Sequence, residues 1–293
     1  MLIPLHVFLF VLFAALLHAS WNAIIKSSGN AALDTVALTI AAALLSCLIL
    51  PLTEAPAAAS WPWLAASVVL HVCYFLMLGA VYRLGDLSHV YPLMRGIAPL
   101  LVALTGAFWL GETLSVAVWT GIALISVGIL LPVVRHPQVL AERATPLALV
   151  IAAVTASYTL VDGYGTRASG SSLGYCLWMF VLEAPPIVFA AWLSQRSRVW
   201  SYCLQRWRFA AAGAVCVVGS YSIALWAMTE APIAAIAALR ETSVLFAAII
   251  GCTLLKEKLG VWRVTGATKG SSDNATLARG EDPHQEQLVQ KLP

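Results

Sequence analysis

The chain has 293 residues, of which 60% are hydrophobic and only 11% are charged, and its formal net charge is +3. Soluble domains carry about 25% charged residues and about 45–50% apolar ones. So few charges cannot cover a water-exposed surface, which argues against a soluble enzyme, a nucleic-acid-binding protein and a disordered chain. The composition therefore predicts an integral membrane protein whose surroundings are the lipid bilayer.

Apolar runs of about 20 residues, the length that a helix needs to cross a bilayer, recur along the chain between turn and charge signals. The alternation of apolar and polar residues that is typical of membrane-spanning strands is absent from the sequence. We therefore expect an all-α integral membrane fold with nine transmembrane helices. The expected helices are residues 4–25, 33–53, 62–82, 87–110, 115–134, 145–162, 172–193, 208–228 and 231–255.

Two segments of the chain match each other at a constant offset of 145 residues, so that Arg95 corresponds to Arg240 and Glu112 to Glu257. Two copies of a unit of about five helices enter the membrane in opposite senses, as in the inverted repeats of secondary transporters, whose substrate site lies between the halves. The predicted domains are a first repeat, an incomplete second repeat without its tenth helix, and a polar disordered tail, at residues 4–134, 145–267 and 268–293.

Similar short motifs close the two copies, Trp-Leu-Gly-Glu at 109–112 and Leu-Leu-Lys-Glu at 254–257. This pairing resembles the EamA domain of the drug/metabolite transporter superfamily. The resemblance implies a ten-helix inner-membrane carrier of small metabolites or drugs, and the polar tail departs from that pattern. The sequences of residues 18–22, 91–96 and 239–243 resemble a bacterial branch of this family, some members of which are encoded near phosphonate-utilisation genes.

Arg95 and Arg240 lie within expected helices, roughly 12–14 Å from one end at 1.5 Å per residue, close to the bilayer midplane. A charged residue there costs about 2.5–3.5 kcal/mol, so it should face the interior of the bundle. The two arginines then either bind substrate or hold helices together through ion pairs. Glu241 cannot face its neighbour Arg240 on a helix, so it is free to meet another partner such as Arg95.

Two guanidinium groups that face one cavity suit a carboxylate, phosphate or phosphonate group. We expect Trp21, Asn22, Tyr91 and Tyr158 to complete this substrate site, although aromatic residues near helix ends also serve as interface anchors. Pro92 and Pro99 are expected to kink the helix around Arg95, as a moving element or as a static packing feature.

Proton coupling is expected to involve Glu183, which lies mid-span, or His18, whose side chain type exchanges protons near neutral pH. Either could instead be a hydrogen-bonded structural group, and His71 is a weaker candidate of the same kind. Glu112 and Glu257 are expected to be helix caps or gate elements. The sequence has no nucleotide-binding loop, metal motif or catalytic set, so we expect a gradient-driven protein without a cofactor and not an enzyme.

The odd-numbered loops, counting the segment 256–267 after the ninth expected span as the last of them, contain eleven basic residues. The even-numbered loops contain one, Arg167. The positive-inside rule then places the odd-numbered loops in the cytoplasm, with the N-terminus outside and the tail inside. The family that the sequence resembles is usually drawn with both ends in the cytoplasm, which conflicts with this count.

These features predict a secondary transporter that moves a small, anionic metabolite across the inner membrane by alternating access. A cation or drug exporter is the first alternative, in which Glu183 and Glu241 bind the substrate. A truncated remnant that does not transport is the second. A homodimer is left open, and no nucleic-acid partner is expected.

Overall fold

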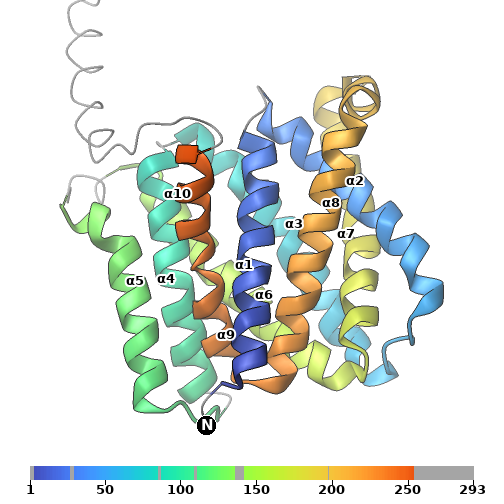
Figure 1. The fold of residues 1–293 in the computed structure, drawn as a ribbon. Helices are drawn as coiled ribbons and strands as arrows, with labels where there is room; N and C mark the ends of the chain where they lie inside the picture. Colours follow the sequence, from blue (N-terminus) through green and yellow to red (C-terminus); the bar gives the residue numbers. More distant parts are fainter. Residues whose placement is uncertain are drawn as a thin grey trace, which may run out of the picture. The chain divides into compact units, whose positions relative to one another are not determined.

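The structure, a computed structural model, describes residues 3–26, 30–84, 87–108, 111–135, 142–196 and 198–253. Within these ranges the regular structure is entirely helical, as the sequence predicts (Figure 1). The helices are α1 (Leu5–Lys26), α2 (Ala31–Ile49), α3 (Trp61–Leu84), α4 (Leu87–Phe108), α5 (Val116–Arg135), α6 (Thr145–Ser169), α7 (Ser172–Gln195), α8 (Arg198–Glu230), α9 (Ile233–Arg240) and α10 (Ser243–Thr253), with short 3₁₀ turns at Leu50–Leu52 and Ala58–Ser60. Glu257, the predicted loss of the tenth helix and the predicted tail all concern residues outside the described ranges.

Eight helical segments of the described chain are long and apolar enough to cross a membrane, and Val116–Leu131 is a shorter apolar helix. One of the eight, Ile233–Ile250, consists of α9 and α10 together. Their number matches the nine expected spans. Large apolar side chains such as Phe108 and Val116 are each 82% exposed, a surface that suits lipid tails and not water.

Two helices are longer than expected, because polar residues at their ends take part in packing. α6 continues beyond residue 162 to Ser169, where Gly170 adopts a left-handed conformation (φ 70°) that ends the helix. α8 begins at Arg198, where the sequence predicts a loop up to residue 208. Its first turns are held to α2 because Val199 is buried there and Asp34 accepts hydrogen bonds from the side chains of this segment.

The last expected span is broken in the middle. α9 ends at Arg240 and α10 begins at Ser243, and Figure 1 shows the two as separate segments beside α1. In the break, the amides of Glu241, Thr242, Val244 and Leu245 each bond to the carbonyl three residues back, at 2.9–3.1 Å, instead of four. This tighter turn places Arg240 and Glu241 in the interior of the bundle. By contrast, α4 is one continuous helix through Pro92 and Pro99.

The helix contacts fall into matched sets. α1 packs on α8 as α3 packs on α6, and α2 packs on α8 as α3 packs on α7. Likewise α1 packs on α9 and α10 as α4 packs on α6, while α2 packs on α7 and α4 on α9. Two inverted halves of the chain would produce these pairs. The repeat boundaries 4–134 and 145–267 remain a prediction.

Candidate substrate site

A small cavity lies where α4, α6 and α9 meet in the middle of the bundle. Its volume is about 20 Å³, enough for one or two water molecules. Arginine, threonine, tyrosine and glutamate side chains line it together with small apolar residues. The lining residues are Arg95, Ala98, Pro99, Val102, Thr155, Tyr158, Thr159, Ala237, Arg240 and Glu241.

Arg95 extends from α4 toward the break between α9 and α10. Its Nε lies 2.9 Å from Oε2 of Glu241, and its Nη2 donates to Oγ of Ser243 at 3.3 Å. The Nε–H does not point at the carboxylate oxygen, so the contact with Glu241 is an ion pair and not a well-aligned hydrogen bond. The sequence analysis names Arg95 as a partner that Glu241 could meet, and the structure confirms the pair.

Arg240 lies on the opposite side of the same cavity and is paired differently. Its guanidinium carbon lies 5.1 Å from the centre of the Tyr221 ring, in cation–π geometry. Among the described residues, no carboxylate lies within ion-pair distance of Arg240. The cavity therefore contains two guanidinium groups but only one carboxylate, that of Glu241.

The other predicted substrate residues divide into two groups. Tyr158 lines the cavity from α6, as does Pro99 from α4, whereas Tyr91 and Pro92 do not. Trp21 and Asn22 are absent from the lining as well. The side chain of Asn22 donates to the backbone carbonyl of His18, one helical turn earlier, at 2.8 Å.

The two predicted proton-coupling residues lie away from the cavity lining. Glu183 is buried on α7, and its Oε2 has no hydrogen-bond partner in the described part of the chain. The His18 ring meets the Trp21 ring edge-on, with centroids 5.1 Å apart. Trp21 Nε1 is also buried without a hydrogen-bond partner among the described residues.

Asp162 is a buried carboxylate that the sequence analysis misses. Its side chain is 0% exposed and accepts hydrogen bonds from the hydroxyls of Tyr175 (3.3 Å) and Tyr221. The expected span 145–162 ends at this residue, which places it at the membrane surface, whereas α6 continues for two more turns. Gly170, the residue that ends α6, is the signal in the sequence that could have corrected the boundary.

Glycine residues on α6 bring this carboxylate close to its partners. A Cβ atom at Gly165 would collide with the Tyr175 ring, and one at Gly163 would collide with Ile233 of α9. Small residues at helix contacts allow such close approach in membrane bundles. As a result α6 lies against both α7 and α9, and Tyr175 reaches Asp162.

Glu112 joins the two halves of the chain at the end of the bundle where α9 begins. Its Oε1 accepts hydrogen bonds from the backbone amide of Ile233 and from Nη1 of Arg167, both at 3.1 Å. Arg167 also donates to the carbonyls of Met228 (2.8 Å) and Ala231 (3.0 Å), at the end of α8. Glu112 thus caps a helix of the other half, one of the two roles that the sequence predicts for it.

The chain is similar to known proteins in part of its sequence and in its fold. Residues 143–269 match the model of the EamA-like transporter family. No curated protein matches the chain. One solved crystal structure shares the fold with a TM-score of 0.66 at 15% sequence identity, over 89% of this chain and 93% of that chain. The matched segment runs from just before α6 to beyond α10 and makes this part of the chain similar to a family of transporters.

Proposed function

We propose that this protein is a secondary transporter of a small anionic metabolite, which binds between Arg95 and Arg240. The observation that carries the proposal is the cation–π placement of Arg240, which leaves its guanidinium without a carboxylate partner in the described structure. A cation within the bilayer that has no carboxylate in ion-pair contact is costly unless an anion or water meets it.

The chemistry of the cavity favours a planar or tetrahedral oxyanion. Guanidinium groups bind carboxylate, phosphate and phosphonate oxygens through paired hydrogen bonds. Thr155, Thr159 and Tyr158 add hydroxyl groups to the same lining. The match to the EamA-like transporter family supports a transported small molecule and does not bear on the phosphonate association.

The size of the cavity supports alternating access. A volume of about 20 Å³ holds water but no metabolite, so α4, α6 and α9 must move apart before substrate enters. The break between α9 and α10 is one element that such a movement can use. The Glu112–Arg167 ion pair, at the end of the bundle where α9 begins, is a contact that such a movement would break.

Transport without a nucleotide-binding loop needs a gradient, and we propose that it is a proton gradient. The sequence predicts Glu183 or His18 as the coupling residue, and neither lines the cavity. We also place the protein in the inner membrane, with the N-terminus outside, on the distribution of basic residues. Uptake into proteoliposomes that does not respond to an imposed pH gradient would contradict the proton coupling.

A thermal-unfolding screen of the detergent-purified protein against anionic and cationic metabolites tests the proposed substrate class. A ligand at 100 times its Kd stabilises the native state by about 2.7 kcal/mol. An anion should raise the midpoint of wild type but not of Arg240→Gln. Arg208→Gln is the matched control, because Arg208 is exposed and contacts only the Trp207 ring among the described residues.

A cation exporter is the second candidate, and the presence of Glu241 in the cavity favours it. A cation would compete with Arg95 for this carboxylate. Stabilisation by cations alone, lost in Glu241→Gln and kept in Arg240→Gln, would replace the anion proposal by this one. The absence of any cooperative unfolding transition would favour the truncated remnant.

A further inference from the structure

We propose that His71 and Asp162 share one proton, which the protein takes up when an anion binds at Arg240. This proposal rests on the proposed anion transport. It assigns the coupling proton to a pair of side chains on α3 and α6 and not to Glu183 or His18. Three contacts of the pair support this assignment, and the third connects the pair to the cavity.

The first contact is between the two side chains themselves. Nε2 of His71 lies 4.0 Å from Oδ2 of Asp162, and the side chains are 9% and 0% exposed. The Asp162 carboxylate already accepts hydrogen bonds from Tyr175 and Tyr221. Those hydroxyls hold the carboxylate in place without neutralising its charge.

The second contact fixes which nitrogen of the His71 ring carries hydrogen. Nδ1 lies 3.0 Å from the backbone carbonyl oxygen of Ser67 and 3.2 Å from its hydroxyl. The Ser67 hydroxyl can either donate to Nδ1 or accept from it, but a carbonyl oxygen only accepts, so we infer the tautomer in which Nδ1 carries hydrogen. In the neutral ring Nε2 is then an acceptor, and it faces Oδ2 of Asp162, which is an acceptor too. A proton placed on either atom turns this pair of acceptors into a donor and an acceptor.

The third contact connects the pair to the substrate cavity. The His71 ring lies over the Tyr158 ring, with centroids 4.2 Å apart, and Tyr158 lines the cavity. On the other side, the Tyr221 hydroxyl bonds to Oδ2 of Asp162, and the face of the same ring carries the guanidinium of Arg240. One aromatic side chain therefore separates the proton site from the cavity on each path.

The charges around the pair determine the sign of the coupling. Arg240 is a cation on the cavity side, across the Tyr221 ring from Asp162, and its charge opposes a second positive charge on His71. An anion bound to Arg240 removes that opposition, so anion binding and protonation favour each other, and the effect is reciprocal. The expected result is symport of an anion with a proton. The other ionisable groups near the pair are Tyr74 on α3, Arg95 on α4, Tyr158 on α6, Tyr175, Cys176 and Glu183 on α7, Tyr221 on α8 and Glu241 after α9.

Proton uptake on anion binding tests the coupling directly. Inorganic sulfate is added to the purified full-length protein in weakly buffered detergent solution, and a pH indicator records the protons removed. Sulfate does not itself titrate near neutral pH, so the protons enter the protein. We expect about one proton per bound sulfate in wild type. We expect none in His71→Gln or Asp162→Asn, although sulfate still raises their melting midpoints.

The matched controls locate the proton. His6→Gln removes a histidine at the beginning of α1, whose described contact is with the Trp226 ring, and it should behave like wild type. Glu183→Gln and His18→Gln should also keep the uptake. Loss of uptake in either of these two, with uptake retained in His71→Gln, would overturn the assignment to His71 and Asp162.

A second readout does not depend on anion binding. Nitrogen NMR of protein with ¹⁵N-labelled histidine shows which ring nitrogen carries hydrogen, and the His71 signal is the one missing from His71→Gln. We expect hydrogen on Nδ1 of the neutral His71 ring. A His71 ring that carries hydrogen on Nε2 when neutral would overturn the pair as a proton site. If the neutral His71 ring carries hydrogen on Nδ1 as expected while sulfate leaves every midpoint unchanged, the proposed anion function has failed and the coupling to it is overturned.

Discussion

The Nε atom of Arg95 lies 2.9 Å from Oε2 of Glu241, so this ion pair joins α4 to the break between α9 and α10. Both side chains are largely shielded, at 15% and 7% exposure. The corresponding arginine of the second segment, Arg240, lies on an aromatic ring instead. The two arginines that match in sequence therefore have different expected roles. We expect Arg95 to be structural as well as functional, and Arg240 to be mainly functional.

Replacement of Arg95 should destabilise the protein more than replacement of Arg240. Arg95→Gln leaves the Glu241 carboxylate buried without its cation, which costs about 3–5 kcal/mol. Arg240→Gln removes only a cation–π contact, worth about 0.5–2 kcal/mol. Thermal midpoints of the two purified variants compare these costs. The double variant Arg95→Gln/Glu241→Gln should recover part of the loss, and an Arg240→Gln midpoint lower than that of Arg95→Gln would contradict this assignment.

Breaking the Glu112 contacts should open the end of the bundle where α9 begins. Glu112→Gln removes the charge that Arg167 meets at 3.1 Å and weakens the cap on the amide of Ile233. A cysteine introduced at Ala237 in the cavity lining should then react faster with a membrane-impermeant maleimide than the same cysteine does in a chain that keeps Glu112. Labelling of each chain without the Ala237 cysteine is subtracted. Glu230→Gln, at the exposed end of α8, is the control. Equal labelling rates in the Glu112 and Glu230 variants would show that the contact is not a gate.

Gly165 and Gly128 offer a matched pair of glycine substitutions within helices. A Cβ at Gly165 would collide with Tyr175 and displace its hydroxyl from Asp162, whereas a Cβ at Gly128 has nothing within 4 Å. Gly165→Ala should therefore destabilise by about 1–3 kcal/mol, as overpacking does. Gly128→Ala should be neutral or stabilising, because alanine favours the helix by about 1 kcal/mol. Thermal unfolding measures both, and similar midpoints would count against the close contact of α6 with α7.

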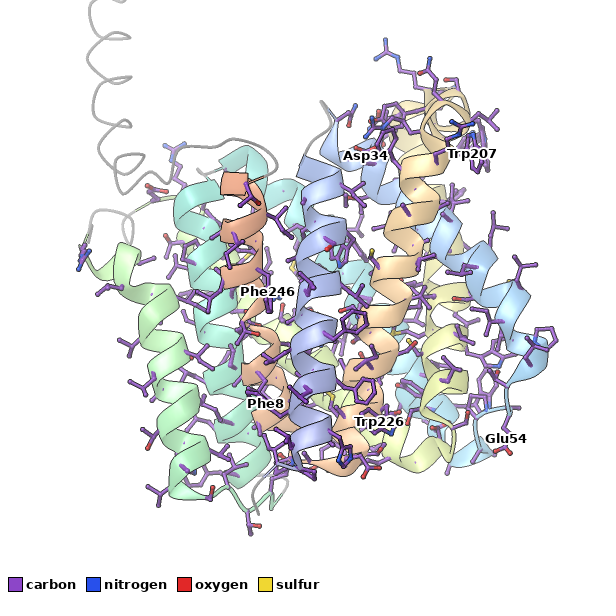
Figure 2. All side chains as sticks on the ribbon, viewed as in Figure 1. Phe8, Asp34, Glu54, Trp207, Trp226 and Phe246 are labelled. Atoms are coloured by element: carbon purple, nitrogen blue, oxygen red, sulfur yellow. The ribbon has the colours of Figure 1, made fainter. Side chains whose placement is uncertain are left out.

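The first turns of α8 should depend on Asp34 of α2. Asp34 is 7% exposed, and its Oδ1 accepts from Arg206 Nε at 3.2 Å and from the Tyr202 hydroxyl at 3.0 Å. Figure 2 shows Asp34 and Trp207 at the same end of the bundle. Arg206→Gln should lower stability by about 1–3 kcal/mol, since it leaves a buried carboxylate poorly paired. Arg208→Gln, two residues away and exposed, should change it little, and equal losses would refute the role of the ion pair.

The number of spans could be predicted from the sequence because a bilayer imposes the same length of apolar helix on each of them. The ends of the helices could not, where tertiary contacts decide them. Residues 198–207, which include two arginines, are predicted as a loop, yet Val199 and Asp34 hold them as part of α8. The break at Glu241 also escapes prediction, because the sequence around it is apolar enough for one continuous helix.

The candidate site could be predicted in part. Arg95, Arg240 and Tyr158 meet at the cavity because intramembrane charge is restricted to the interior. Trp21 and Asn22 do not reach it, since neighbouring positions on one helix cannot all face the same way. Asp162 was missed because a span boundary set seven residues too early placed it at the surface.

Anion uptake by proteoliposomes tests the central claim most directly. Vesicles with wild type, Arg240→Gln or the control Arg208→Gln receive the anion that stabilises wild type most strongly in the thermal screen, with and without an inward proton gradient. The account predicts that wild type and Arg208→Gln accumulate the anion, faster with the gradient, and that Arg240→Gln does not. Equal accumulation in all three preparations, or transport of cations alone, would contradict it.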